Sequence, residues 1–237
     1  MDQEVIRFSE AERSLFVPGR NCWRVERAGR FSIIVDAADY FRAAKDAMLK
    51  ARCAIYLIGW DFDTRIRFEP GGKTLPGPNK LGPFLRWLDR TRPGLRVHVL
   101  KWDLGALPTL SRGATPLFIM NWMTSKRVTF KLDSAHPLGA AHHQKIVVVD
   151  DVLAFCGGLD MTANRWDTRN HLDTDRRRFG HEDLPWHDST TAVDGAVAKA
   201  IGELARERWL RATGEALAVP EPLPPIWPDR LEPSLTD

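Results

Sequence analysis

The sequence has few cysteines and no long apolar run. The three cysteines, Cys22, Cys53 and Cys156, form an odd set without metal-ligand spacing, which argues against a disulfide framework. No apolar stretch approaches the roughly 18 residues of a membrane span, and the acidic, charge-broken start is unlike a secretory signal. We therefore expect a cytoplasmic, reducing compartment, with any membrane contact being peripheral, at the inner face.

A strong excess of one charge is also lacking. The net charge is only +3 over 237 residues, so we expect no nucleic-acid partner on this ground, although a mildly basic surface suits anionic partners. Hydrophobic residues make up 43% of the chain and charged residues 27%, which is typical of a globular protein.

Apolar periodicities of helix and strand alternate along the chain. Helical spacing occurs over 36–52, 81–92, 115–123 and 196–213. Strand-like runs occur over 53–59, 95–102, 127–133, 145–150, 152–157 and 189–195. The alternation predicts an α/β fold in which a mixed β-sheet is sandwiched between helices. We expect a lead segment over 1–30, one α/β domain over 31–215, and a proline-rich linker or tail over 216–237.

Reactive side chains stand directly before the apolar run of "AHHQKIVVVDDVLAFCGGLD", residues 141–160. His143 and Lys145 are two residues apart and so share one face of an extended chain. A protonated histidine beside a lysine is repelled, but an anion between them can be held by the lysine while the neutral imidazole attacks it. Phosphate fits this description best. The alternatives are an ordinary surface histidine or a metal-binding fragment, although no partner stands nearby at zinc-like spacing.

The segment "HHQKIVVVD" followed by "GGLD" resembles the HxKxxxxD signature of the phospholipase D superfamily. The similarity extends to "NRWDTRNH" (164–171), "PWHD" (185–188) and "AIYLIGWDFDTRI" (54–66). This combination is more similar to phospholipase D proper than to the nucleases or phosphatidyltransferases of the superfamily. It covers about residues 20 to 215 and implies the phospholipase D fold, a phospholipid substrate at a membrane surface, and no metal or other cofactor.

The resemblance also implies roles for individual residues. His143 would be the nucleophile that forms a phosphohistidine, or the general acid that protonates the leaving alcohol. Lys145 would hold the phosphate oxygens. Asp150 would orient the motif, and Asp188 matches the acidic partner of the catalytic imidazole. The candidate substrate-binding residues are Asp160, Trp166, Trp186 and His187. A strand cap at Asp188 and a turn residue at Asp160 remain the alternatives.

The chain holds one HxKxxxxD motif where the family uses two. His98 stands three residues before Lys101 and so lacks the spacing. One imidazole cannot both attack phosphorus and protonate the leaving group from the far side. We therefore expect a second motif, from a homodimer mate or from a C-terminal domain, and the proline-rich close favours the latter. The functional alternatives are a phosphatidyltransferase similar to cardiolipin synthase, a nuclease, and a non-catalytic half that binds a membrane or a partner.

Overall fold

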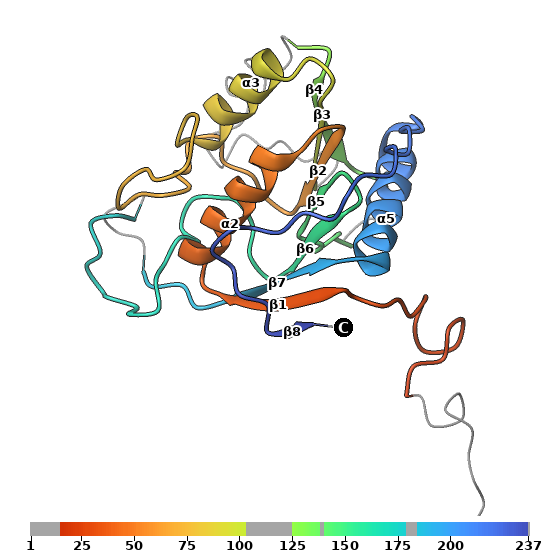
Figure 1. Ribbon diagram of the computed structural model, residues 1–237, viewed down its shortest axis with the longest axis horizontal. Coiled ribbons are helices and arrows are strands. Elements are labelled where there is room, and N and C mark those ends of the chain that lie inside the picture. The colour runs from red at the N-terminus through yellow and green to blue at the C-terminus, as the bar shows by residue number, and fades with distance from the viewer. Residues whose placement is uncertain (1–14, 103–124, 138–139, 179–183, 237) are drawn as a thin grey trace, which may run out of the picture.

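One mixed sheet organises the domain (Figure 1). The computed structural model describes residues 15–102, 125–137, 140–178 and 184–236. Eight strands lie in the order β4-β3-β2-β5-β6-β7-β1-β8. The strands are β1 (Arg30–Val35), β2 (Ala54–Gly59), β3 (Arg96–Trp102), β4 (Val128–Asp133), β5 (Ile146–Val149), β6 (Leu153–Gly157), β7 (Ser189–Asp194) and β8 (Leu235–Thr236). The helices are α2 (Ala37–Lys50), α3 (Leu81–Thr91) and α5 (Ala196–Thr213).

The sheet is parallel at one end and antiparallel elsewhere. Strand β3 pairs in parallel with both β2 and β4, and α3 provides the crossover from β2 to β3, as a parallel pair requires. Strands β2, β5, β6, β7 and β1 pair antiparallel in turn. Strand β5, which follows the motif histidine, therefore lies in the middle of the sheet.

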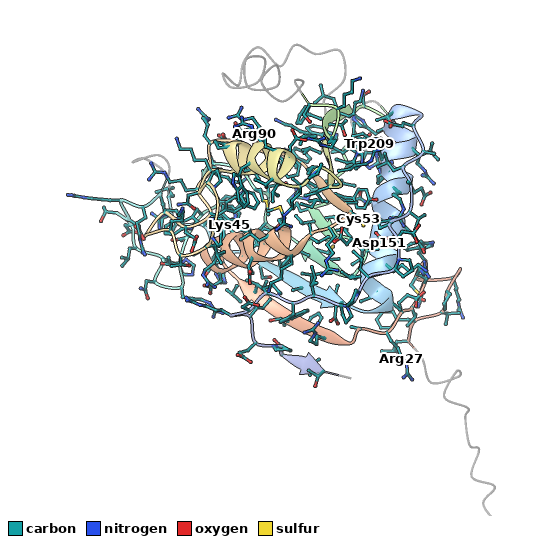
Figure 2. The ribbon with its side chains drawn as sticks, turned by 45° about the horizontal axis from the view of Figure 1, so that its top comes forward. Arg27, Lys45, Cys53, Arg90, Asp151 and Trp209 are labelled. Carbon is teal, nitrogen blue, oxygen red and sulfur yellow. The ribbon has the colours of Figure 1, made fainter. Side chains whose placement is uncertain are left out.

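Helices cover both faces of the sheet. In β2, Ile55 and Leu57 belong to the core cluster under α2 and α3, whereas Tyr56 and Ile58 belong to the cluster under α5. Because β2 is covered on both sides, every one of its residues is buried. Trp209 of α5 lies over the second face (Figure 2). The predicted α/β sandwich is thus confirmed, and no helix among the described residues is long and apolar enough to cross a membrane.

The turn between β5 and β6 joins the sheet to α5. Asp150 and Asp151 both have positive φ angles, 54° and 59°, as a tight hairpin turn requires. Asp151 Oδ1 accepts a hydrogen bond from Arg206 at 2.8 Å. The same oxygen would lie 2.1 Å from a Cβ at Gly202, so only glycine lets α5 approach this turn so closely.

Most helices and strands agree with the sequence-based expectation to within two residues at each end. Strand β1 (Arg30–Val35) was missed, because its short pattern is not a simple alternation: the more buried face carries Arg30 and Ser32, and the apolar Ile33 is exposed on the other. It pairs with β7 and places Asp36 at the start of α2. The helix predicted over 115–123 lies outside the described residues.

The proline-rich segment 216–237, expected as a linker or tail, packs against the domain over its described part. Lys50 Nζ donates to the carbonyl of Trp227 at 2.6 Å, and the backbone N–H of Asp229 donates to Asp46 at 2.6 Å. Strand β8 then pairs with β1. The prolines correctly predict the absence of a helix, but these contacts come from side chains of α2 that composition does not reveal.

Candidate active site

The motif histidine and lysine meet at one indole. Both residues precede β5, at the edge of the sheet where Trp60 follows the last residue of β2. The His143 ring stands edge-on to Trp60 with centroids 4.9 Å apart, and Lys145 Nζ lies 5.9 Å from the centroid of the same ring. Lys145 is 7% exposed, whereas His143 is open to solvent. The site therefore offers an accessible imidazole beside a buried ammonium group.

The neighbouring histidine points elsewhere. His142 Nε2 lies 3.2 Å from the carbonyl oxygen of Ala135, and its ring packs against His136 with centroids 5.8 Å apart. Trp60 is held by stacking on Trp102 at 4.1 Å. Of the two adjacent imidazoles, His143 is thus the one that packs against the indole near Lys145.

Asp160 is the anionic neighbour of the motif lysine. Its Oδ2 lies 3.2 Å from Lys145 Nζ, yet no hydrogen bond to the ammonium is aligned among the described residues. Its Oδ1 accepts hydrogen bonds from the backbone N–H groups of Trp60 at 3.0 Å and Asp61 at 3.3 Å. Burial raises the pKa of Asp160, and the charge of Lys145 opposes that rise. In this structure Asp160 therefore positions Lys145 and the end of β2.

A second carboxylate beside the site, that of Asp61, was not predicted from the sequence. Asp61 Oδ1 lies 2.6 Å from Lys101 Nζ, and the Thr162 hydroxyl donates to Asp61 Oδ2 at 2.8 Å. Burial alone would raise the pKa of Asp61, but Lys101 and Thr162 outweigh it and hold the pKa below its usual value. The ion pair joins residues 40 positions apart, so no local spacing signals it.

Asp150 lies at the opposite end of β5 from His143 and Lys145. Its carboxylate accepts hydrogen bonds from the backbone N–H groups of Arg52 at 2.6 Å, Cys53 at 2.8 Å and Ala54 at 2.7 Å. These are the donors just before and at the start of β2. The motif aspartate thus fastens β2 to the β5–β6 turn, in keeping with an architectural role.

Asp188 lies over Gly158, directly after the end of β6. Its carboxylate would come within 2.1 Å of a Cβ at Gly158, which explains a glycine there. It accepts a hydrogen bond from the backbone N–H of Ser189 at 2.7 Å. Between the described residues His143 and Asp188 there is no hydrogen bond, so the role of Asp188 as the imidazole's acidic partner stays a prediction.

His187 belongs to a different group from His143. Its Nδ1 lies 2.9 Å from Asp36 Oδ1, and His171 Nε2 lies 3.4 Å from Asp36 Oδ2. One ligand atom from each residue lies within 4.8 Å of the others, and imidazole and carboxylate are ligands that divalent cations accept. These residues could hold a metal ion. They come from three separate segments, which is why the sequence, from which we expected no metal, gave no signal.

The two candidate tryptophans lie in different surroundings. Trp186 is 38% exposed, and the Arg165 guanidinium stacks on it 3.9 Å from the ring centroid. Trp166 is buried, and the Arg177 guanidinium lies 5.1 Å from its centroid. Trp186 could therefore touch a substrate at the surface, whereas Trp166 forms part of an interior wall.

The family model that matches this chain and two curated relatives are all described as phospholipase D. The family model described as phospholipase D matches residues 47–221. Phospholipase D C of Dictyostelium discoideum is 24% identical over 207 residues, covering 75% of this chain and 12% of that protein. Phospholipase D beta 2 of Arabidopsis thaliana is 27% identical over 210 residues, covering 70% of this chain and 22% of that protein. The chain thus spans less than a quarter of either relative's length.

The solved structures are only weakly similar to this chain. Nuc of Salmonella typhimurium, described as a phospholipase D family member, has 16% identity and a TM-score of 0.47, covering 76% of this chain and 95% of that one. Phosphatidylserine synthase of Haemophilus influenzae has 15% identity and a TM-score of 0.49, covering 79% and 40%. These similarities are too weak to indicate a function. The family model, in contrast, spans well over half of the sequence and includes the whole HxKxxxxD motif, and the chain therefore belongs to the phospholipase D family.

Proposed function

We propose that the protein is a phosphodiesterase of the phospholipase D type, which cleaves a phospholipid through a phosphohistidine and needs a second HxKxxxxD motif. The observation that supports this most is the pairing of exposed His143 with the buried ammonium of Lys145. That ammonium has no aligned hydrogen-bond partner among the described residues. The ion pair with Asp160 at 3.2 Å offsets part of the cost of burying this charge, and a phosphate oxygen would supply the aligned acceptor that the pair lacks.

The chemistry needs two imidazoles on opposite sides of phosphorus. In the first step a neutral imidazole nitrogen attacks phosphorus, the P–O bond to the head-group alcohol breaks, and the other imidazolium gives that oxygen a proton. In the second step the proton-donating imidazole, now neutral, takes a proton from water. The water oxygen attacks phosphorus, the P–N bond of the phosphohistidine breaks, and phosphatidic acid is released. An alcohol in place of water gives transphosphatidylation. His143 takes one of these roles, and Lys145 stabilises the charge on the phosphoryl oxygens.

The second imidazole must come from another copy or another domain. Beside the motif, part of the sheet face on the α5 side is open: Ile33 is 54% exposed, and Cys156 is exposed. Both pair in register with Thr191, so the three residues form one row across β1, β7 and β6. We propose that the second half packs against this row, because its residue Cys156 belongs to β6, the strand that ends next to Lys145.

The test compares the two adjacent histidines. Choline release from phosphatidylcholine vesicles is measured for the protein assembled with its second motif, for His143→Asn and for His142→Asn as the matched control. We expect His143→Asn to lose at least about a thousandfold in rate and His142→Asn to stay within about tenfold. Salt-dependent DNA binding with cleavage would instead favour the nuclease. No turnover by the assembled protein on either substrate would favour a non-catalytic half.

A further inference from the structure

A cationic pocket lies apart from the imidazole and ammonium of the motif. It is formed by the loop between β2 and α3 and by the loop that follows β6, which lie together at one end of the domain (Figures 1 and 2). Its volume is about 390 Å³, which suits a small molecule. Among the residues that the structure describes, every charged residue that lines it is basic. These residues are Arg67, Lys80, Arg176, Arg177 and Arg178.

Two of the five cations are already neutralised. Arg177 Nε donates to Asp175 Oδ1 at 2.9 Å, and Arg178 donates to the buried carboxylate of Asp167, also at 2.9 Å. These contacts hold the loop after β6 in place. They leave both guanidinium groups in the wall of the pocket without an excess charge.

The other three cations lack such compensation. Arg67, Lys80 and Arg176 are exposed, and within the described parts of the chain none of them makes an ion pair. Gathering three like charges around one cavity is unfavourable. An anion in the cavity would relieve this repulsion and could accept hydrogen bonds from all three side chains.

The pocket also has a buried aromatic wall. Trp166 lines the pocket and is only 8% exposed. Its indole Nε1 is buried and has no hydrogen-bond partner among the described residues. Ile66 and Pro70 add apolar surface. A ligand with anionic oxygens and a small organic body matches this lining better than a bare inorganic ion does.

We propose that this pocket binds a phosphate monoester of about the size of glycerol phosphate. The pocket is distinct from the phosphoryl position of His143 and Lys145, but a short segment of chain connects the two. Thr162 lines the pocket and donates to Asp61, and Asp160, which pairs with Lys145, is two residues before Thr162. The binding proposed here does not depend on His143 being catalytic. A free phosphate ester and the head group of phosphatidic acid both present the required chemistry.

The experiment measures binding of glycerol 3-phosphate to the full chain by isothermal titration calorimetry. The pocket variant is Arg67→Gln with Arg176→Gln. The matched control is Arg90→Gln with Lys199→Gln, which removes the same charge from exposed positions on α3 and α5 (Arg90 is labelled in Figure 2). Lys145→Gln reports on the catalytic position. We expect affinity to fall at least about tenfold in the pocket variant and to change less than about threefold in the other two.

Vesicle sedimentation distinguishes the two sources of the phosphate monoester. If the ligand is a lipid head group, vesicles of phosphatidylcholine with phosphatidic acid will bind the control variant more strongly than the pocket variant. If the ligand is a free ester, the two variants will bind these vesicles equally while the calorimetric difference persists. The proposal is overturned if glycerol 3-phosphate does not bind, if the pocket and control variants bind it equally, or if only Lys145→Gln weakens binding. None of these outcomes bears on whether His143→Asn abolishes choline release.

Discussion

Asp150 Oδ1 accepts a hydrogen bond from the backbone N–H of Ala54 at 2.7 Å, across 96 residues of sequence. The same carboxylate binds the N–H groups of Cys53 and Arg52. The last residue of the HxKxxxxD motif therefore fixes the start of β2 relative to β5, and β2 in turn carries Trp60 to the site. In this structure the motif places His143 before one end of β5 and a structural carboxylate, Asp150, at the other.

Replacing Asp150 should impair stability more than chemistry. Asp150→Ala leaves three backbone donors without their acceptor, and we expect the free energy of unfolding to fall by about 3 kcal/mol. Urea denaturation monitored by tryptophan fluorescence measures this loss. Activity per folded molecule, measured below the unfolding transition, should change less than about tenfold. A stable Asp150→Ala protein without activity would assign the carboxylate a chemical role instead.

The glycine that follows β6, Gly158, makes room for Asp188. In Gly158→Ala the added methyl group would meet the Asp188 carboxylate at 2.1 Å, so either the carboxylate or the strand end must shift. We expect at least about a hundredfold loss of kcat, because positioning errors of this size are costly in catalysis.

Gly94→Ala serves as the control for Gly158→Ala. The nearest atom to a Cβ at position 94 is 4.0 Å away, and the rate should be unchanged. Equal activity of both variants would show that the position of Asp188 does not matter for the reaction.

His98 makes stability depend on pH. It is buried between Tyr56 and Trp209, and burial lowers its pKa from 6.5 to about 4. The unfolded chain therefore takes up a proton at a higher pH than the folded chain does. Above pH 6.5 the histidine is neutral in both states. As the pH falls from 6.5 to 4 the protein should lose about 3 kcal/mol of stability through this group, at ~1.4 kcal/mol per pH unit.

The measurement for His98 is urea denaturation at several pH values between 4 and 7. His98→Gln should flatten the pH dependence over this window, since it removes the titrating group while keeping a polar side chain next to Thr129, the hydrogen-bond partner of His98. An unchanged slope in the variant would mean that other groups cause the acid sensitivity.

Sequence reasoning succeeded where the signal is local. The apolar run of β2 and the spacing of His143 and Lys145 are read within a few residues, and the structure brings this histidine and lysine to one indole. Contacts between residues that are far apart along the chain were not predicted. Asp36 joins His187 across 151 residues, and Lys50 holds the closing segment across 177 residues. Such contacts depend on tertiary packing, which periodicity and composition do not encode.

We propose above all that His143 and Lys145 act on a phosphoryl group only when a second motif faces them. The direct test is to measure sedimentation and choline release on the same samples over a range of protein concentrations, with and without a separately supplied second-motif domain. We predict no turnover by the monomeric chain, with turnover appearing in proportion to the assembled form. Hydrolysis by the monomer, at a rate that does not change on assembly, would show that a second motif is not required.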